Sequence, residues 1–379
     1  MQKRIRIVSI GIILIVLFIS VIILNNNTNN KHTFKKDGIL YALSLDGKSI
    51  TSFPSKGLYK ANVTCEGADG KWLYDDWKLA IENITGDVSC DIKFETITKT
   101  YLNNYIIGLT GTAQGTGQVV NEKGYRYEGK NPNNYVWFNN EYWRIIGVFD
   151  SASHGQSGKN LVKIIRADVL DGLAWHKSNT NDWTAASLNS LLNGAYYNAQ
   201  DGTSSGYCYG YSTTATANCD YTKKGIQSGY RSMIAEVTWY LGGYSSASAT
   251  TESFYGYERG TTVYSGRPTT TTGYIGLMYP SDYGYSVLSS SCARTTNLGS
   301  YNTATCAGQS WLYGKGYEWT ITPFSSYSSY VFRLVSYGFL NISDYAYRGD
   351  GGRPVLYLDA SVYKIDGEGT LDKPYIIGM

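Results

Sequence analysis

The 379-residue chain contains little charge, little histidine and little proline. Charged residues make up 17% of it and the formal net charge is only +3, whereas binding to nucleic acid requires a concentrated basic surface. The three histidines, His32, His154 and His176, leave few ways to build a histidine-based metal site or acid–base site. We therefore predict that the protein uses no nucleic-acid partner, no metal and no cofactor.

Tyrosine and glycine are abundant instead, with 36 and 42 residues against 7 prolines and 4 methionines. Hydrophobic residues make up 42% of the chain, which is enough to form a core, and the length allows two domains or three. A chain rich in Tyr, Gly, Ser and Thr favours a β-rich protein with long ordered loops. The same composition argues against a helical bundle or a coiled coil.

One long apolar run, from Ile7 to Leu24, lies close to the N-terminus. As a helix it would extend about 27 Å, which is close to the thickness of a bilayer core. A buried core helix is disfavoured because the run has no polar face. A cleaved signal peptide normally has a shorter apolar region and a small-x-small site, and no such site follows Leu24. We predict an uncleaved transmembrane anchor at residues 1–24, and leave cleavage open.

The orientation of this anchor follows from charge and from cysteine. Lys3, Arg4 and Arg6 precede the apolar run and favour a cytoplasmic N-terminus. Residues 25–37 are polar and of low complexity, which predicts a linker. The chain has six cysteines, and an even number in an exported protein indicates disulfides. We therefore predict a single-pass protein of the cell membrane whose body is extracellular.

Spacing selects one pairing among the 15 that six cysteines allow. Cys65 ends, and Cys90 begins, a segment of alternating apolar residues, so both are expected to face one small core as a cross-sheet bridge requires. The other four cysteines lie in two short polar loops. The predicted bridges are Cys65–Cys90, Cys208–Cys219 and Cys292–Cys306. A zinc site is disfavoured, because no Cys-x-x-Cys or Cys–His spacing of the required kind occurs.

Local patterns divide the body into a small disulfide-bonded β-module at 38–97 and an α+β domain at 100–379. Alternating apolar residues and turn signals predict strands in the module at 39–45, 48–53, 58–65, 77–84 and 89–97. In the domain they predict strands at 125–127, 135–138, 142–149, 161–166, 274–279, 318–322, 330–335 and 353–359. An amphipathic helix is expected after Asp182 or Thr184, and a shorter one at 227–235. Many short strands with one or two helices indicate α+β rather than a sandwich.

Six motifs of this domain occur in an order that resembles a known family. They are WRIIGV (Trp143–Val148), VKIIRAD (Val162–Asp168), DWTAASLNSLLN (Asp182–Asn193), MYPSDYGYS (Met278–Ser286), WTITP (Trp319–Pro323) and GRPVLYLD (Gly352–Asp359). The region is similar to a domain of unknown function in surface proteins of low-GC Gram-positive gut bacteria. That domain in turn resembles the C-type-lectin-like fold of formylglycine-generating enzymes and of variable proteins of diversity-generating retroelements. Residues 50–97 also resemble a small β-module found beside such domains.

The resemblance implies a C-type-lectin-like α+β fold and a surface location, without an established activity. The formylglycine-generating enzymes need a reactive cysteine pair late in the domain, and this chain has no cysteine after Cys306. Calcium-dependent sugar-binding lectins carry Glu-Pro-Asn, Gln-Pro-Asp or Trp-Asn-Asp motifs, and none occurs here. We therefore expect neither activity to carry over.

The segment from Ser325 to Asp350 is the best candidate for a binding surface. It mixes Tyr, Ser and Asn with two arginines, which is the composition that antibody loops use. The resemblance points the same way, because the corresponding late segment carries the ligand face in the retroelement-varied proteins. We expect the strands at 330–335 and 353–359 to pair through loop Ser336–Gly352, which would then project from one edge of the domain. The predicted ligand-binding residues are Tyr330, Arg333, Tyr337, Tyr345, Tyr347, Arg348 and Asp350.

Two other interpretations of this segment stay open. Its tyrosines could simply cover a β-surface, as tyrosine does elsewhere in the chain. The triplet Arg348-Gly349-Asp350 could act as an integrin-type attachment motif, although so short a motif also arises by chance.

No catalytic residue is predicted. His154 and His176 are expected in surface loops, and Asp344 and Asp350 are not paired as an acid and a base. The predicted function is that of a membrane-anchored extracellular binding protein, adhesin-like or receptor-like, which recognises a protein or glycan ligand and is not an enzyme. The alternatives are a cell-envelope enzyme acting on glycan or peptide, and a purely structural surface protein.

Overall fold

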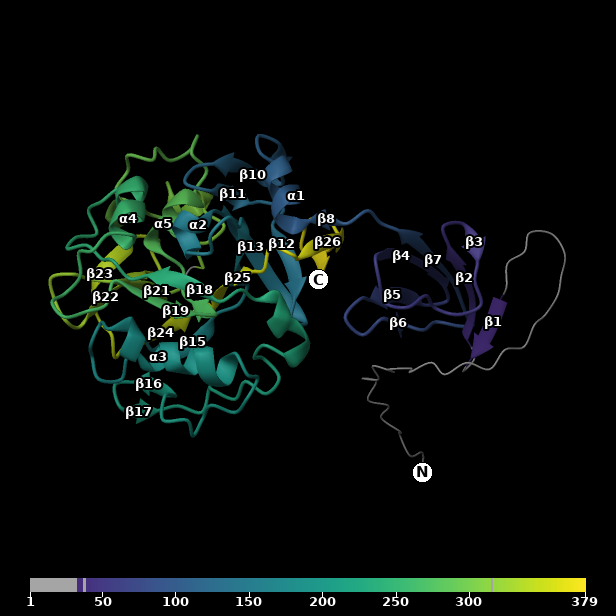
Figure 1. Ribbon diagram of the computed structural model, residues 1–379, viewed down its shortest axis with the longest axis horizontal. Helices are drawn as coiled ribbons and strands as arrows, with labels where there is room; N and C mark the ends of the chain where they lie inside the picture. Colours follow the sequence, from purple (N-terminus) through teal and green to yellow (C-terminus); the bar gives the residue numbers. More distant parts are fainter. Residues whose placement is uncertain (1–32, 37–38, 315) are drawn as a thin grey trace, which may run out of the picture. The chain divides into compact units, whose positions relative to one another are not determined.

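The computed structural model describes residues 33–36, 39–314 and 316–379, and the chain divides into two compact units between Lys99 and Thr100 (Figure 1). The predicted anchor from Ile7 to Leu24 lies outside the described residues. Among the residues that the structure describes, no helix has the length and apolar character needed to cross a membrane. The linker predicted at 25–37 is wrong in one part, because Thr33–Lys36 form strand β1.

The smaller unit is built on one mixed sheet. The strands follow the order β1 (Thr33–Lys36), β2 (Ile39–Leu45), β7 (Val88–Thr96) and β4 (Tyr59–Glu66), with β3 (Lys48–Ser49) also paired to β2. β2 and β7 run parallel, whereas β4 is antiparallel to β7. The turn between β2 and β3 uses Asp46 and Gly47, both with positive φ, as the Asp-Gly pair predicts.

A second hairpin, β5 (Asp69–Leu73) and β6 (Lys78–Glu82), contributes Trp72 and Leu79 to the core of this unit. The Trp72 ring packs edge-on against Phe94, with centroids 4.9 Å apart, and Phe94 is fully buried. Gly70 is required where the hairpin crosses the disulfide, because a Cβ there would lie 2.2 Å from the Cys65 sulfur.

The Cys65–Cys90 disulfide is confirmed, with a Cα–Cα distance of 4.1 Å. Its geometry differs from the expected bridge between sheets. Cys65 and Cys90 are directly opposed in the antiparallel ladder of β4 and β7, so the bridge links neighbouring strands of one sheet. The alternating pattern that places both cysteines on a core face cannot distinguish these two geometries, since both require the same side-chain direction.

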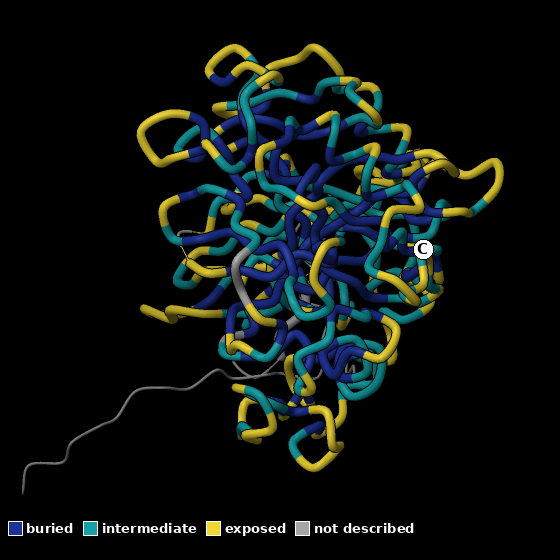
Figure 2. Tube along the Cα trace, turned by 90° about the vertical axis from the view of Figure 1, so that its left-hand side faces the viewer, coloured by how far each residue is buried: buried dark blue, intermediate teal, exposed yellow. Residues whose placement is uncertain are grey.

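The larger unit contains a long sheet and a shorter one. The main path of the long sheet is β20 (Ile275–Gly276), β25 (Val355–Leu358), β14 (Leu161–Arg166), β13 (Glu141–Phe149), β12 (Tyr135–Phe138), β27 (Tyr375–Gly378), β26 (Tyr363–Asp366) and β8 (Thr100–Tyr101). Strands β9 (Ala113–Gln114), β10 (Thr116–Asn121) and β11 (Tyr125–Asn131) extend it beside β13. All six residues of β14 are buried, which makes this strand the centre of the core. Figure 2 shows the buried segments in the middle of the unit and the exposed ones at loop tips.

The shorter sheet has the order β15 (Leu170–Ala174), β24 (Gly349–Gly352), β21 (Glu318–Pro323), β22 (Tyr330–Leu334) and β23 (Leu340–Tyr345). Two strands of this sheet, β23 and β24, lie inside the segment that we expected to be the irregular loop Ser336–Gly352. The expectation that strand 330–335 pairs with strand 353–359 is also wrong, because β22 pairs with β21 and β23 whereas β25 belongs to the long sheet.

Helices are few and short, so the unit is β-rich. Asp182 caps a 3₁₀ turn at Trp183–Ala185, which leads through α3 (Ser187–Leu191) into a π-helical turn at Leu192–Tyr196, as the amphipathic pattern predicts. The expected second helix is a 3₁₀ helix at Ser228–Met233. The other α-helices are α1 (Leu102–Gly108), α2 (Ser151–His154), α4 (Thr251–Glu258) and α5 (Pro280–Tyr285), and two further 3₁₀ helices lie at Leu298–Ser300 and Ala307–Gln309. The remaining strands are β16 (Tyr209–Tyr211), β17 (Thr214–Ala215), β18 (Val237–Tyr240) and β19 (Thr270–Gly273).

The strand predicted at 274–279 is mostly wrong, because only Ile275–Gly276 is extended and paired. Tyr279 instead caps α5, Pro280 occupies the first turn, and the Asp282 side chain accepts from the Tyr279 backbone N–H at 3.0 Å. Pro in the first turn with an acid three residues after the cap is a helix-start signal. The largely apolar residues before it favoured a strand, so the start of the helix was not predicted.

Candidate functional site

Five tyrosine rings follow one another across an exposed part of the larger unit. We call this set the tyrosine row, and its members in spatial order are Tyr327, Tyr330, Tyr345, Tyr347 and Tyr211. Successive ring centroids lie 5.2, 5.0, 5.2 and 5.1 Å apart. Tyr327 and Tyr211, at the two ends, are 59% and 53% exposed, and Tyr345 near the middle is 36% exposed. The row is therefore an open aromatic surface and not a core cluster.

The shorter sheet positions the central part of the row. Tyr330 on β22 stands directly opposite Tyr345 on β23 in the antiparallel ladder, where side chains of opposed residues meet on one face. β23 is the last strand in the order of this sheet, so Tyr345 lies at its edge. Tyr327 precedes β22 and stacks at 9° on the Phe324 ring, which is nearly buried. One end of the row thus rests on the core.

The Cys208–Cys219 loop positions the other end. Its strand β16 ends at Tyr211 and lies beside β15 and β24 (Figure 1). The Ser212 backbone N–H donates to the Tyr347 carbonyl at 2.7 Å, which holds the loop against the segment before β24. This close approach requires glycine, because a Cβ at Gly349 would lie 2.1 Å from the Gly210 carbonyl oxygen. The disulfide therefore supports a contact between segments more than a hundred residues apart in sequence.

Hydrogen bonds between tyrosine side chains connect the row. The pKa of Tyr330 is raised, chiefly by the hydrogen bond of its side chain with Tyr345. The pKa of Tyr347 is raised in the same way by Tyr211. Tyr330 and Tyr347 are therefore neutral phenols at physiological pH, and the row presents apolar ring faces and polar hydroxyls side by side.

The structure brings together three of the seven predicted binding residues, because Tyr330, Tyr345 and Tyr347 belong to the row. Arg348, which follows Tyr347, is exposed. Tyr337 is 69% exposed and lies outside the row, in the turn between β22 and β23.

The prediction is wrong for Arg333 and Asp350. Their side chains are only 9% exposed each and form an ion pair of 2.6 Å between Nη1 and Oδ2. Arg333 also packs against the Tyr317 ring, 4.4 Å from its centroid. Burial raises the pKa of Asp350 and the charge of Arg333 opposes that shift. Because Asp350 is enclosed and paired, the triplet Arg348-Gly349-Asp350 is not displayed as an attachment motif.

The prediction that His154 and His176 lie in surface loops is also wrong, because both side chains are buried. The Nδ1 atom of His154 accepts from the Gln156 backbone N–H at 3.1 Å, so Nε2 donates to the Phe149 carbonyl at 3.0 Å. The Nδ1 atom of His176 accepts from the Ser178 backbone N–H. Burial lowers the pKa of both rings. Both are neutral side chains that satisfy local backbone groups.

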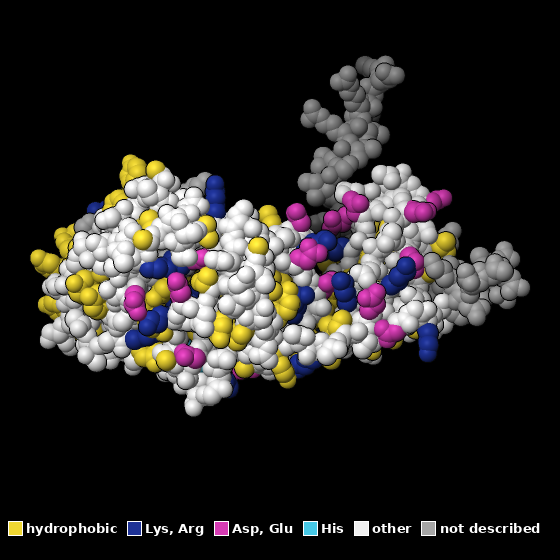
Figure 3. All heavy atoms as spheres, turned by 90° about the horizontal axis from the view of Figure 1, so that it is seen from above, with side chains coloured by type: hydrophobic (Ala, Val, Ile, Leu, Met, Phe, Trp, Pro, Cys, Tyr) yellow, Lys and Arg dark blue, Asp and Glu magenta, His cyan; other side chains and the backbone are white. Residues whose placement is uncertain are grey.

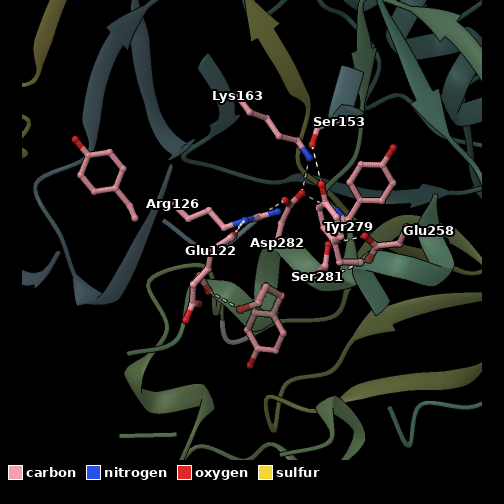
Figure 4. A network of polar contacts seen from close by, with 12 residues as sticks. Glu122, Arg126, Ser153, Lys163, Glu258, Tyr279, Ser281 and Asp282 are labelled. Atoms are coloured by element: carbon pink, nitrogen blue, oxygen red, sulfur yellow. Dashed lines mark hydrogen bonds and ion pairs between the residues drawn. The ribbon is translucent and has the colours of Figure 1, made fainter. Parts of the chain in front are cut away.

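Charges that the sequence analysis did not single out meet inside the larger unit (Figure 4). The Asp282 carboxylate accepts from Arg126 Nη1 at 3.0 Å and from Lys163 Nζ at 2.5 Å, and all three side chains are at most 2% exposed. We call these three residues the Asp282 cluster. One sequence feature could have indicated this cluster. Lys163 is a cation in the aliphatic run LVKIIR, and the surrounding residues are typical of a buried central strand.

Burial perturbs this cluster and its neighbour Glu258. It lowers the pKa of Lys163 to about 8, against the opposing charge of Asp282. It also raises the pKa of Glu258 to about 7, although Arg259 opposes the shift. The Glu258 carboxylate accepts from the Ser281 backbone N–H at 2.8 Å and from the Ser281 hydroxyl at 2.5 Å. These buried groups are engaged with one another, so they hold the fold together and do not face a substrate.

A hollow of about 320 Å³ in the smaller unit is a weaker candidate. It lies along β2, β3 and β7, and its charged lining residues are Asp91, Lys93 and Glu95. Asp91 and Lys93 form an ion pair with each other at 3.6 Å. Within the described ranges, no group of three or more His, Cys, Asp or Glu side chains could hold a metal ion.

Comparison with known proteins adds no assignment: no family model, no curated protein and no solved structure matches the chain.

Proposed function

We propose that this chain is a membrane-anchored extracellular binding protein and that the tyrosine row holds its protein or glycan ligand. The observation that carries the proposal is the row itself, five rings in contact with one another at an exposed sheet edge. Three local disulfides also support an oxidising, extracellular location.

Exposed tyrosines are well suited to recognition. Each ring offers a large contact area and loses little conformational entropy on binding, because only two torsions are fixed. The hydroxyl at its tip adds a hydrogen bond to a polar ligand. The neighbouring rings limit the motion of each side chain before a ligand arrives, which reduces the entropy cost of binding further.

A C-type-lectin-like fold for the larger unit is part of this proposal. Four of the five members of the row lie between Tyr327 and Tyr347, in the late segment that would carry the ligand face in such a fold. The fifth, Tyr211, comes from the disulfide loop and was outside the predicted segment.

The enzyme alternative receives less support. The strongly perturbed groups Lys163 and Glu258 are enclosed, with 1% and 0% exposure, and have partners. A catalytic group must reach its substrate, and these do not. A binding role therefore explains more of the exposed chemistry than a catalytic one.

The first test is a screen of the full-length chain, solubilised in detergent, against glycan and protein arrays. The double variant Tyr327→Ala/Tyr345→Ala should lose at least tenfold in affinity for any ligand found. The matched control is Tyr337→Ala, which removes an even more exposed tyrosine outside the row and should leave affinity unchanged. Equal losses in both variants, or in neither, would locate the binding surface elsewhere.

Topology is tested separately on intact cells. Protease added outside should release the body of the protein, from the linker onward, while a cytoplasmic marker stays intact. A body that stays protected under those conditions contradicts the extracellular assignment.

A further inference from the structure

Lys163 and Asp282 come from distant parts of the chain and meet in the core of the larger unit (Figure 4). Lys163 lies on β14, the strand between β13 and β25, and Asp282 lies in the first turn of α5. Their side chains are 1% and 2% exposed, and Nζ lies 2.5 Å from Oδ2. An amine and a carboxyl group are thus held in contact away from water.

The surroundings of Lys163 are aromatic and offer it few hydrogen bonds. Its ammonium group has three N–H donors, and among the described residues the structure gives it one acceptor, Asp282. Nζ lies 4.4 Å from the Tyr279 ring centroid, and the Tyr357 and Trp239 rings lie within 5.8 Å. Such a site favours the neutral amine, and burial lowers the pKa of Lys163 to about 8.

The Asp282 carboxyl group is oriented by two further donors. Arg126 Nη1 donates to Oδ1 at 3.0 Å, and the Tyr279 backbone N–H donates to Oδ2 at 3.0 Å. The Arg126 charge therefore acts on the oxygen that Lys163 does not contact. Negative charge developing on Oδ1 during attack at Cγ would be stabilised by this guanidinium, as in an oxyanion site.

We propose that Lys163 and Asp282 condense to form an intramolecular isopeptide bond between β14 and α5. Nζ first transfers a proton to Oδ2, which converts the ion pair into an amine and a carboxylic acid. The nitrogen lone pair then forms a bond to Cγ, and the Cγ–Oδ1 π electrons move onto Oδ1. A second proton passes from nitrogen to Oδ2, the Cγ–Oδ2 bond breaks, and Oδ2 leaves as water. Oδ1 becomes the amide carbonyl oxygen, so atoms and charge balance without a co-reactant.

Two physical effects favour this condensation inside the fold. Groups held in contact react with effective concentrations of about 10⁵–10⁸ M, far above those of free groups. The product also replaces the Lys163 ammonium and the Asp282 carboxylate by a neutral amide, and the water is released to solvent. Arg126 keeps a hydrogen-bond acceptor, because Oδ1 becomes the amide oxygen. The two cations hold the pKa of Asp282 low against the effect of burial, which keeps the neutral acid rare and the reaction slow. It needs to occur only once in the life of each molecule.

Mass spectrometry of the reduced full-length chain tests the proposal. We expect a mass about 18 Da, one water, below that calculated from the sequence, and a proteolytic peptide pair joined through Lys163 and Asp282. Asp282→Ala should restore the calculated mass. Asp282→Asn should instead lose about 17 Da, because ammonia leaves in place of water.

Two more variants distinguish the isopeptide bond from a loss of water at another place in the chain. A succinimide at Asp282 also loses one water but needs no lysine, so Lys163→Arg should restore the full mass only if the bond is to Lys163. Glu318→Gln alters another buried ion pair, with Arg353, and should keep the loss of water. A folded wild-type chain of full calculated mass overturns the proposal, and so does a mass loss that persists in Lys163→Arg. Either result leaves the binding role of the tyrosine row untouched.

Discussion

The two units differ in whether they bury charged side chains. The smaller unit has 16 charged residues among the 61 from Ile39 to Lys99, and none of those is among the buried residues. The larger unit has 40 among the 280 from Thr100 onward, and eleven of those whose burial the structure describes are buried. Figure 3 shows many charges on the visible face of the smaller unit and few on that of the larger one.

Aromatic residues fill the core of both units, and the larger unit in addition exposes tyrosines along its sheet edge. The larger unit thus has buried charges that link segments inside it, and its surface includes exposed hydroxyl-bearing rings. The difference teaches that low charge content in this chain does not indicate a weak polar architecture, because removing one partner of a buried ion pair destabilises a fold far more than breaking an exposed pair does. Four predictions test this comparison.

The largest effect is expected from the Asp282 cluster. Asp282→Ala leaves two buried cations without their carboxylate, so the free energy of unfolding of the larger unit should fall by at least about 3 kcal/mol. Guanidinium unfolding followed by tryptophan fluorescence measures this. The control is Glu252→Ala, which breaks an exposed pair with Lys123 and should cost less than about 1 kcal/mol. Similar losses in the two variants would contradict the contrast between buried and exposed charge.

Removing the Cys208–Cys219 disulfide should affect stability and binding together. Replacing both cysteines by serine frees a short loop and should lower the free energy of unfolding by about 2–4 kcal/mol. It should also weaken ligand binding, because Tyr211 is no longer held against Tyr347. Removing Cys292–Cys306, a loop of similar length, should reduce stability comparably and leave binding intact. Denaturant unfolding and ligand binding are measured on both variants. Equal effects of the two variants on binding would contradict a specific role of the Cys208–Cys219 disulfide in holding Tyr211.

A pH dependence is expected from Glu258. Its pKa rises from about 4.5 in the unfolded chain to about 7 in the fold, so the folded state holds the proton more tightly. This contribution to stability is present below about pH 4.5 and is lost as the pH rises to about 7. The loss should be on the order of 1–3 kcal/mol. Denaturant unfolding at about pH 5 and about pH 7.5 measures how far the free energy of unfolding falls between the two pH values. This fall should be smaller in Glu258→Gln than in the wild type. An equal fall in both would mean that other groups cause it.

The smallest effect on stability is expected from the tyrosine row. Tyr327→Ala and Tyr345→Ala remove exposed side chains, and each should change the free energy of unfolding by less than about 0.5 kcal/mol. Binding should nevertheless be lost, so affinity and stability separate. Urea unfolding of the same samples used for binding measures both. A large loss of stability would mean that these rings belong to the core, as the alternative interpretation of the segment holds.

Local sequence patterns predicted the parts of the fold that depend on neighbouring residues. The turn-forming pair Asn139-Asn140 separates the strands predicted at 135–138 and 142–149, and both residues have positive φ in the hairpin between β12 and β13. Asp182 marked the start of a helical segment, and its side chain accepts from the Thr184 backbone N–H. The three disulfides were predicted because each closes within one local region. In all these cases the physical cause lies within a few residues or one strand pair.

Long-range partners explain what the sequence analysis missed. Arg333 and Asp350 look like surface residues in a Tyr- and Ser-rich segment, and only the pairing of β21 with both β22 and β24 buries them together. Tyr211 joined the row through a contact with the segment before β24, more than a hundred residues away. Lys163 stood out in an aliphatic strand, but its partner Asp282 lies on α5, which begins directly after the segment predicted as a strand at 274–279. The spacing of residues along the chain does not predict such contacts between residues that are distant in sequence.

The parallel pairing of β2 and β7 in the smaller unit has a mechanical consequence. Ile39, which begins β2, pairs with Val88, and Phe94 near the end of β7 pairs with Leu45, which ends β2. If the chain is anchored ahead of β1 and pulled from beyond Thr96, strand β1 is peeled from β2 first. The force then enters β2 and β7 at opposite ends of these two adjacent strands. The load then acts along the strands, so all hydrogen bonds between β2 and β7 are loaded at the same time and are not broken one after another from one end. A tether attached in this geometry resists traction by shear, which would suit the proposed membrane-anchored binding protein.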